Sequence, residues 1–537
     1  MSVARARRIV LGGPPAVGKS TVGAALAASL GWQFIDLDRA LEAAHGRAIS
    51  TWFAESGEAS FRAAERAMLD SLLSGTERVI AVGGGALTDT AWRHTVLTRA
   101  RVFGLSAPLP TLVSRAAREG HRPLVSDDPA RQLAALLSAR EEGYAEVDAT
   151  VENSGSVASA AAALAGLNDA LGDSLVVPLG RRSYPISFGP AASFASHLAR
   201  GGGPSRRVGL VVTDTTVAVA QARALDALCR AWGAESLRLE AGEAHKQLAA
   251  LGPVWSTLLR LGVDRQGLVA ALGGGVVSDM VGLAAALYLR GIDYVSVPTT
   301  LLAMADAAVG GKTAVDLAEG KNLIGAFHHP RAVCVDVDTL DTLSAGEYRA
   351  GLAEVLKVGV VVDPGLLDFC EAHAAALAVA PRAAGWAEAR ALRVEVIRGA
   401  IAAKIAVVAA DEREAGLRAV LNFGHTLGHA VEQASGYALR HGEAVGFGMR
   451  AALDLGVRLG ITPAELRQRV VGTLRAMRLG ASPGVDYDLA WKALFHDKKR
   501  DSQGLRFVLA EAPGRARLRH VDAPEVADVF RAALENG

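Results

Sequence analysis

The sequence predicts a multidomain α/β protein. Its 537 residues are too many for one hydrophobic core, and this length suggests three or four domains. Short apolar runs, typical of buried strands, lead into glycine-rich turns and then into Ala- and Leu-rich helical stretches. The alternation begins near Arg8 and resumes from Val208, so we expect two parallel sheets flanked by helices.

Composition excludes several classes of protein. Half of the residues are apolar and the formal net charge is +1, which argues against disorder and against electrostatic binding to nucleic acid. No apolar run is long enough to span a bilayer. The start, MSVARARRIVLGG, resembles a signal peptide but has no Ala-x-Ala cleavage site after its apolar residues, so we expect a cytoplasmic protein with no membrane partner. Cys229, Cys334 and Cys370 form no CxxC, which excludes a disulfide framework and a cysteine-based zinc site.

The first glycine-rich turn follows an apolar strand at residues 8–11. It reads GPPAVGKST and is followed by a helical stretch, which is the context of a Walker A phosphate loop. Loop N–H groups would hold phosphates, Lys19 would bridge the β- and γ-phosphates, and Ser20 would bind Mg²⁺. A glycine-rich turn without a ligand is the alternative. The predicted ATP-binding residues here are Gly13, Gly18, Lys19, Ser20 and Thr21.

More motifs follow in the first 165 or so residues. They are Phe34-Ile-Asp-Leu-Asp38, Gly57-Glu58, Phe61-Arg62 with Glu65, Val82-Gly-Gly-Gly85, Arg122-Pro-Leu, and Arg140 with Tyr144. In this order the segment resembles shikimate kinase, which implies a P-loop kinase domain that uses ATP and Mg²⁺. By that resemblance Asp38 orients the hydroxyl to be phosphorylated and Asp36 helps to hold the Mg²⁺ shell. The resemblance also implies two further sets: Arg122 and Arg140 for ATP and the transferred phosphoryl, and Asp38, Arg62, Gly83, Gly84, Gly85 and Arg140 for shikimate.

Two adjacent residues of the phosphate loop depart from the shikimate kinase pattern. The loop has Ala16-Val17 where the family usually has glycine and a small residue. Alanine is strained wherever the backbone needs a positive φ, so this departure bears on ATP affinity more than on the chemistry. It also leaves open that the kinase-like half is inactive.

A helical run at residues 158–171 closes the first predicted domain, which spans residues 1–171. The second, at 172–335, contains strand-like segments at 208–214, at 268–275, where the strand runs into a glycine-rich turn, and at 295–300. Glycines 273–275 follow one of these strands, but they do not form GxGxxG, and a plain turn is equally compatible with them. The pattern nevertheless favours a parallel, Rossmann-like sheet that binds a dinucleotide at the strand ends.

Three of the chain's 13 histidines lie close together in the third predicted domain, at residues 336–537. On a helix, His425 and His429 would share one face because they are four residues apart. With His441 and a carboxylate they could bind zinc. The alternative is a helix whose histidines cap, pair or pack.

Colinear motifs from about residue 175 to the end resemble 3-dehydroquinate synthase. They are Gly242-Glu243-x-x-Lys246, Gly273-Gly-Gly-Val276-x-x-Asp279, Arg290-Gly291, Pro298-Thr-Thr-Leu-Leu302, Asp306-x-x-Val309-Gly-Gly-Lys312, Lys321-Asn322, Ala353-Glu354-x-x-Lys357, and the stretch from Arg418 to Glu443. The resemblance implies an NAD-binding domain followed by a mainly helical metal- and substrate-binding domain. The implied NAD contacts are Asp214, Glu243, Lys246, Gly274, Gly275, Val276, Asp279, Thr299, Thr300 and Leu302.

The same resemblance assigns the metal, Zn²⁺ or Co²⁺, to Glu354, His425 and His441, and it gives His429 to the substrate. It implies a homodimer through the synthase-like region, in which Arg290 reaches the neighbouring subunit's site. The implied catalytic residues are Asp306, Lys357, Glu414, Asn422 and His429. The implied heptulosonate phosphate contacts are Arg290, Asp306, Lys312, Asn322, Lys357, Lys404, Arg418, Asn422, His429 and one lysine of Lys498-Lys499, with Lys498 preferred.

Together the resemblances imply a bifunctional enzyme of the shikimate pathway. One half would phosphorylate the 3-hydroxyl of shikimate, and the other would convert 3-deoxy-D-arabino-heptulosonate 7-phosphate to 3-dehydroquinate and phosphate. Two alternatives stay open: one half is an inactive regulatory module, or the second half is a polyol dehydrogenase. A polyol needs no phosphate-binding cations, so the lysine- and arginine-rich set favours the synthase.

Overall fold

The computed structural model describes residues 5–119, 128–191, 193–194, 208–317, 320–496, 500–501 and 504–535. Arg122, Lys498 and Lys499 lie outside these ranges. Contacts divide the chain into two compact units: unit 1 is Met1–Phe188 with Ser196–Ser205, and unit 2 is Gly189–Ala195 with Arg206–Gly537. Among the described residues, no helix is long and apolar enough to cross a membrane.

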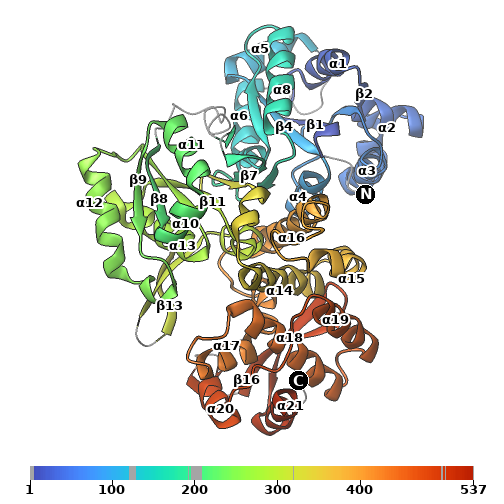
Figure 1. Ribbon diagram of the computed structural model, residues 1–537. Helices are drawn as coiled ribbons and strands as arrows, with labels where there is room; N and C mark the ends of the chain where they lie inside the picture. Colours follow the sequence, from blue (N-terminus) through green and yellow to red (C-terminus); the bar gives the residue numbers. More distant parts are fainter. Residues whose placement is uncertain are drawn as a thin grey trace. The chain divides into compact units, whose positions relative to one another are not determined.

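Unit 1 is built on a parallel sheet with the strand order β2-β3-β1-β4-β5, coloured blue to cyan in Figure 1. Successive residues of β1 face opposite sides: Ile9 and Leu11 pack with α1, α5, α6 and α8, whereas Val10 packs with α2, α3 and α4. The elements are β1 (Arg8–Gly12), α1 (Lys19–Leu30), β2 (Gln33–Asp36), α2 (Leu37–His45), α3 (Ile49–Leu72), β3 (Arg78–Ala81), α4 (Thr90–Arg99), β4 (Arg101–Ser106), α5 (Leu109–Glu119), α6 (Pro129–Ala139), α7 (Glu141–Ala145), β5 (Ala149–Glu152), α8 (Val157–Leu171) and the antiparallel pair β6 (Leu175–Val177) and β7 (Tyr184–Phe188).

The dinucleotide-type part of unit 2 contains the parallel strands β14-β11-β10-β8-β9. From β8 the chain first adds β9 on one side and then crosses back to add β10 on the other side, so the strand order reverses at β8. Parallel α/β sheets bind ligands at such a reversal point. The elements are β8 (Val208–Asp214), α10 (Thr215–Ala220), α11 (Ala222–Trp232), β9 (Glu235–Leu239), η2 (Glu243–His245), η3 (Leu248–Leu251), α12 (Gly252–Arg260), β10 (Leu268–Gly273), α13 (Gly275–Leu287), η4 (Tyr288–Arg290), β11 (Asp293–Pro298), η5 (Ala303–Ala307), the hairpin β12 (Lys312–Leu317) and β13 (Gly320–Phe327), β14 (Ala332–Val335) and η6 (Val337–Thr342).

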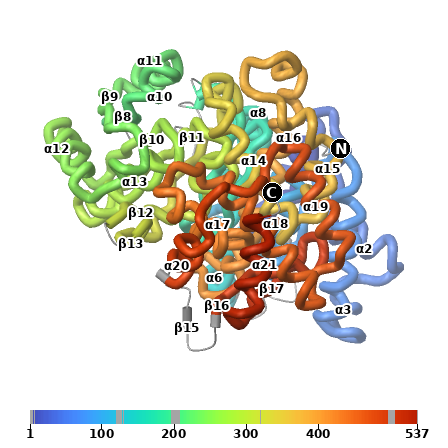
Figure 2. Tube along the Cα trace, turned by 60° about the horizontal axis from the view of Figure 1, so that its bottom comes forward, coloured from blue at the N-terminus to red at the C-terminus, as the bar shows by residue number. Residues whose placement is uncertain are grey.

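The remainder of unit 2 is mainly helical, as predicted, but it also contains the antiparallel strands β15, β16 and β17 (Figure 2). Its core packs Leu427, Val431 and Phe447 against β16 and the C-terminal helix. The elements are α14 (Ala345–Val361), α15 (Pro364–Leu377), α16 (Arg390–Ala410), η7 (Leu417–Asn422), α17 (His425–Ala434), α18 (His441–Arg458), α19 (Ala464–Ala476), α20 (Tyr487–His496), β15 (Arg500–Asp501), β16 (Gly504–Ala512), β17 (Arg515–Val521) and α21 (Ala523–Glu535).

Candidate active sites

The loop between β1 and α1 is shaped to hold a phosphate. Gly18 begins α1 in the left-handed conformation at φ 93°, and among the described residues no side chain caps this helix. The first N–H groups of α1 are therefore available to an anion. Lys19 Nζ donates to the carbonyls of Gly13 (3.0 Å) and Pro14 (2.9 Å), so it lies across the loop. Ser20 Oγ donates to Asp36 Oδ2 at 2.6 Å.

Ala16 has a φ of 60°, which is the left-handed conformation expected at a loop position where glycine is usual. Such a backbone costs an L-amino acid about 1 to 2 kcal/mol. The side chain is buried. The loop is thus formed, but at a cost that glycine would avoid.

One pocket joins the phosphate loop to the acceptor side of unit 1, because Lys19, Ser20, Asp36 and Asp38 line it together with Gly83 and Gly84 of the glycine loop. Glycine is needed here for close approach. A Cβ at Gly83 would lie 3.0 Å from both Asp38 Oδ1 and Glu65 Oε1, and one at Gly85 would lie 2.3 Å from an Arg62 nitrogen. The predicted ATP and shikimate residues therefore meet at one place.

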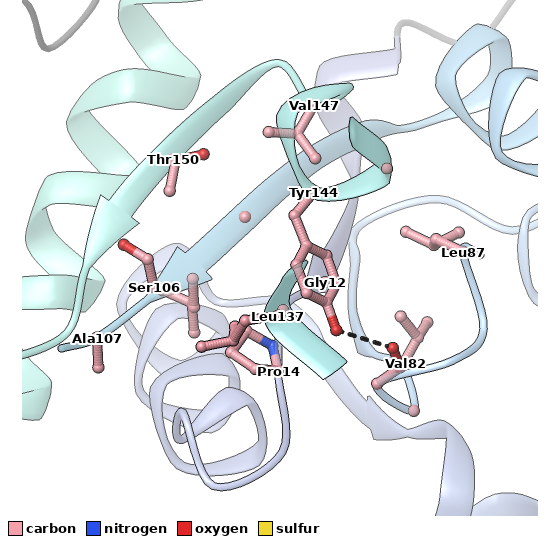
Figure 3. A pocket seen from close by; sticks show the side chains of 16 residues that line it. Gly12, Pro14, Val82, Leu87, Ser106, Ala107, Leu137, Tyr144, Val147 and Thr150 are labelled. Atoms are coloured by element: carbon pink, nitrogen blue, oxygen red, sulfur yellow. Dashed lines mark hydrogen bonds between the residues drawn. The ribbon is translucent and has the colours of Figure 1, made fainter. Parts of the chain in front are cut away.

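Arg62 is held beside this loop by two carboxylates, since it forms ion pairs with Glu58 (3.1 Å) and Glu65 (2.7 Å). Burial raises the pKa of Glu65, although Arg62 opposes the shift. Across the pocket, Arg140 NH1 (2.7 Å) and the Tyr144 hydroxyl (3.1 Å) both donate to the Gly84 carbonyl. Figure 3 shows the Tyr144 ring in an adjoining apolar pocket, with its hydroxyl directed toward this loop.

Two residues that sequence patterns did not single out support the phosphate loop. Asn153 donates through Nδ2 to the Val17 carbonyl (2.8 Å), and the Asn153 backbone carbonyl accepts from Arg115 NH2 (2.9 Å). A Cβ at Gly18 would lie 2.8 Å from Asn153 Nδ2, so this side chain lies directly on the loop. No short motif joins Asn153 to the loop, because the two are 136 positions apart.

In unit 2, the predicted NAD residues lie at the carboxyl ends of the parallel strands. Asp214 ends β8 and caps α10, Gly274 precedes α13, and Thr299 with Thr300 follows β11. A Cβ at Gly274 would lie 3.1 Å from Thr300 Cγ2, so the glycine turn and the threonines are neighbours. The remaining predicted contacts flank these positions: Glu243 and Lys246 at η2, Gly275, Val276 and Asp279 in the first turns of α13, and Leu302 before η5.

Lys246, Asp279 and Asn322 form a polar group beside α13. Lys246 Nζ lies 2.6 Å from Asp279 Oδ2 and 2.5 Å from Asn322 Oδ1. Burial raises the pKa of Asp279 to about 6, with Lys246 opposing the shift. The hairpin residue Asn322 thus reaches the dinucleotide end of the sheet.

A second cluster lies at the start of α17 and α18. His425 Nε2 and His441 Nε2 are 3.5 Å and 3.4 Å from the same oxygen, Oε1 of Glu354 on α14. The His429 ring is 5.3 Å from that of His425 and 5.7 Å from that of His441, and one nitrogen from each of the three lies within 4.8 Å of the others. His425 and His429 therefore share a helix face, as their spacing predicted, and a third imidazole and a carboxylate join them.

The other ring nitrogen of each of two histidines is held from outside the cluster. His425 Nδ1 lies 3.2 Å from the Phe423 carbonyl, and His441 Nδ1 lies 3.1 Å from Glu432 Oε2. Lys321 Nζ in turn donates to Glu432 Oε1 at 2.8 Å. Such outer bonds orient imidazoles that bind metal. Glu432 follows His429 by three residues on one helix face, and that spacing is the signal by which the sequence could have indicated it.

The pKa values of His425 and His441 are shifted in opposite directions. Burial lowers the pKa of His425 well below its usual value, with Lys357 adding to the shift, so this imidazole is neutral. Burial also opposes charge on His441, but the nearby Glu354 and Glu432 carboxylates raise its pKa to about 9. The buried Glu354 carboxylate pairs with Lys357 and lacks hydrogen bonds of regular geometry. A carboxylate and imidazoles converging in this way match the oxygen and nitrogen ligands of a catalytic zinc site.

Cationic and amide groups surround this cluster. Lys404 pairs with Asp306, and burial lowers the Lys404 pKa to about 8. Arg418 donates to the Gly310 carbonyl at 3.1 Å. Lys312 pairs with Glu414, to which Asn422 Nδ2 donates at 2.9 Å.

Arg290 is not part of this group. It lies on η4, after the C-terminal end of the 13-residue helix α13, about 20 Å along the helix from Gly275. Its side chain is exposed, and both Leu289 and Arg290 have positive φ values, of 51° and 67°. Arg290 therefore lies at the end of α13 that is remote from the predicted NAD residues of the same chain.

These features define a class of protein: a P-loop nucleotide-binding unit joined to an α/β and helical unit with a metal-type Glu/His cluster. Comparisons with known proteins narrow the class. Residues 15–167 match the family model of shikimate kinase, and residues 236–350 and 351–500 match the N-terminal and C-terminal models of 3-dehydroquinate synthase. The chain belongs to the 3-dehydroquinate synthase family, and it is a fusion of such a synthase with a shikimate kinase.

Relatives of the second part include the 3-dehydroquinate synthase of Rhodospirillum rubrum, which is 44% identical over 380 residues, or 67% of this chain and 94% of that protein. That of Bordetella pertussis is 45% identical over 362 residues, or 66% of this chain and 96% of the relative. A solved structure of 2-epi-5-epi-valiolone synthase from Streptomyces hygroscopicus with NAD⁺ and Zn²⁺ bound is 32% identical, with a TM-score of 0.58, over 66% of this chain and 97% of that one.

Proposed function

We propose that this protein catalyses two separated steps of the shikimate pathway. The kinase part uses Mg²⁺ and ATP to phosphorylate the 3-hydroxyl of shikimate. The synthase part uses NAD⁺ and Zn²⁺ or Co²⁺ to convert 3-deoxy-D-arabino-heptulosonate 7-phosphate to 3-dehydroquinate and phosphate. The observation that carries the second activity is the approach of His425 and His441 to one oxygen of Glu354.

In the kinase part, Lys19 and the N–H groups of the phosphate loop hold the phosphates of ATP, and Ser20 with Asp36 holds Mg²⁺. Asp38 orients the acceptor hydroxyl from the pocket that it shares with Lys19. Arg62 and Arg140 bind the shikimate carboxylate, since a guanidinium offers two parallel donors to such a group. Arg122 would add positive charge over the transferred phosphoryl. The remaining predicted ligands are Gly13, Gly18 and Thr21 for ATP and Gly83, Gly84 and Gly85 for shikimate.

In the synthase part, Glu354, His425 and His441 would hold the metal. When bound, the metal would chelate adjacent substrate hydroxyls and lower their pKa, while NAD⁺ would take up and return one hydride. Lys404 and Arg418 bind the substrate carboxylate. The substrate phosphate is bound by Lys312, Asn322, Asn422, His429 and a lysine of the Lys498-Lys499 pair, and its own oxygens are available as the base for its elimination. Asp306, Lys357, Glu414, Asn422 and His429 position groups or relay protons.

This cationic set also argues against the polyol dehydrogenase alternative. A polyol carries neither a carboxylate nor a phosphate, so buried cations such as Lys357 and Lys404 would have no anionic partner in the substrate. Net production of NADH by the purified protein would instead support the dehydrogenase, because the synthase regenerates NAD⁺ in each turnover.

A homodimer through the synthase region completes the proposal, with Arg290 reaching the neighbouring copy's phosphate site. Its support is the exposure of large apolar side chains at the end of α13, on η4 and on the β12–β13 hairpin, which a partner could cover. These side chains are Leu287, Leu289, Leu317, Leu323, Ile324 and Phe327. We also propose a cytoplasmic location and keep the domain limits 1–171, 172–335 and 336–537 as predictions.

Supplying each acceptor substrate separately to the purified protein tests both activities. ADP should form from ATP and Mg²⁺ when shikimate is the only acceptor, and phosphate should be released from the heptulosonate phosphate when it is supplied with NAD⁺ and the metal but without shikimate and ATP. Asp38→Asn should remove the first activity and leave the second unchanged. Normal ADP formation in that variant would contradict the kinase site, and no phosphate release by the metal-loaded wild type would contradict the synthase.

A further inference from the structure

The turn between β6 and β7 contacts the kinase-type part of unit 1. It is closed by hydrogen bonds from the Arg182 N–H to the Leu179 carbonyl and from the Ser183 N–H to the Gly180 carbonyl, each 3.1 Å. By sequence this turn lies in the synthase-like part, which begins near residue 175. Its contacts nevertheless place it in unit 1.

Three glutamates of the α7 region bind the turn through hydrogen bonds and an ion pair. The Gly180 N–H donates to Glu146 Oε1 at 2.9 Å in a buried position, and the Arg181 N–H donates to Glu142 Oε2 at 3.2 Å. The Arg181 guanidinium forms an exposed ion pair with Glu141. Gly180 has a φ of 60°, and a Cβ there would lie 1.6 Å from Glu142 Oε2. The positive φ therefore favours glycine in this turn, and a Cβ at this position would displace the Glu142 carboxylate.

Two other residues of the α7 region are bonded to the glycine loop of the proposed shikimate site. Arg140, which precedes α7, and Tyr144, within it, both donate to the Gly84 carbonyl. Glu146 Oε2 also accepts from Arg93 Nε at 2.7 Å, and Arg93 NH1 donates to the Leu87 carbonyl at 2.8 Å. Two routes of hydrogen bonds thus lead from the turn to the loop at 83–88.

A five-residue helix such as α7 is not stable by itself, so its position depends on what holds its two sides. We propose that the β6–β7 turn is a positioning element of the kinase site, which holds α7 and thereby keeps Arg140 and Tyr144 on Gly84. This inference rests on the proposed kinase function. It means that the first turn of the synthase-like sequence contributes to shikimate binding.

Gly180→Ala in the full-length protein tests the proposal against a matched control, Gly31→Ala. Gly31 also has a positive φ, of 69°, but a Cβ there would meet nothing within 4 Å. Both variants carry similar backbone strain, and only Gly180→Ala displaces Glu142. Calorimetric titration with shikimate, without nucleotide, should show about fivefold weaker binding for Gly180→Ala, the factor that corresponds to one net hydrogen bond. Gly31→Ala should bind shikimate like the wild type.

A second pair of variants separates positioning from a general loss of stability. Arg181→Glu places like charges beside Glu141 and should weaken shikimate binding about twofold at low salt, whereas Arg181→Lys should not. Thermal unfolding should not differ between these two variants. Shikimate affinities of Gly180→Ala and Arg181→Glu equal to those of their controls would overturn the inference. Absence of shikimate-dependent ADP formation by the wild type would instead overturn the proposed kinase function.

Discussion

At the scale of single residues, Lys404 makes the proposed synthase step dependent on pH. Burial lowers its pKa from 10.5 to about 8, and Asp306 only partly opposes the shift. If the substrate carboxylate needs a charged Lys404, kcat/KM for the heptulosonate phosphate should fall about tenfold per pH unit above pH 8. Phosphate release measured against pH should show this decrease above pH 8, and Lys404→Arg should move the decrease to higher pH.

The contribution of Lys404 to folding stability changes with pH in the opposite direction to the activity. Because the folded-state pKa lies below the unfolded value, the unfolded chain binds more protons between about pH 8 and 10.5, so this lysine's contribution to stability rises with pH in that window. Loss of activity above pH 8 would therefore not reflect unfolding at Lys404. A synthase profile that stays flat to pH 10 would contradict this role.

Glu432 is the residue through which we expect metal affinity to be tuned. It is buried and joins His441 Nδ1 to Lys321. Glu432→Ala should weaken zinc binding about 10- to 100-fold, as loss of an outer carboxylate does at other zinc sites. Competition with a chromogenic chelator measures this affinity directly.

The matched control is Glu371→Ala on α15, which removes a glutamate that pairs with Arg469 away from the cluster. Zinc affinity of that variant should equal that of the wild type. Synthase activity of Glu432→Ala should return at saturating zinc. Wild-type zinc affinity in Glu432→Ala would show that the bond to His441 does not support the metal.

At the scale of elements, the distance between α14 and α18 sets the geometry of the cluster. Gly442 follows His441, and a Cβ on it would lie 2.0 Å from the Ala350 carbonyl oxygen and 2.4 Å from Ala350 Cα on α14. Gly442→Ala must push α18 from α14 and His441 from Glu354. We expect a loss of about 1 to 3 kcal/mol of unfolding free energy and at least tenfold weaker zinc binding.

Gly472→Ala on α19 is the control, because a Cβ there would meet nothing within 4 Å. Alanine has the higher helix propensity, so this variant should gain up to about 1 kcal/mol in chemical unfolding. If Gly442→Ala bound zinc normally, the close contact of the two helices would not be what holds His441 in place.

At the scale of the whole molecule, we expect the two activities to depend on different ions. Removing zinc with a selective chelator and then restoring Mg²⁺ should abolish phosphate release from the heptulosonate phosphate and leave shikimate-dependent ADP formation intact. His441→Ala should behave in the same way, because the proposed Mg²⁺ ligands Ser20 and Asp36 belong to unit 1 and His441 to unit 2. Loss of both activities in either experiment would show that the halves do not act independently.

Much of this protein follows from local sequence. Strand, glycine-rich loop and helix are adjacent in the chain at residues 8–30, so the phosphate loop and its strained Ala16 could be predicted from spacing and from the backbone preference of glycine. The shared face of His425 and His429 likewise follows from helix geometry. The fusion and its α/β class were also predicted correctly, since both rest on patterns that are local or colinear.

Only the tertiary structure decided which distant residues meet. The approach of Glu354 to His441, the hydrogen bond from Lys321 on the hairpin to Glu432, and the hydrogen bond from the Gly180 N–H to Glu146 join positions that no periodicity relates. The low pKa of Lys404 has the same origin, because burial is a property of the packed chain. Sequence thus determined the local shapes and the chemical groups available, whereas packing determined their distances and charges.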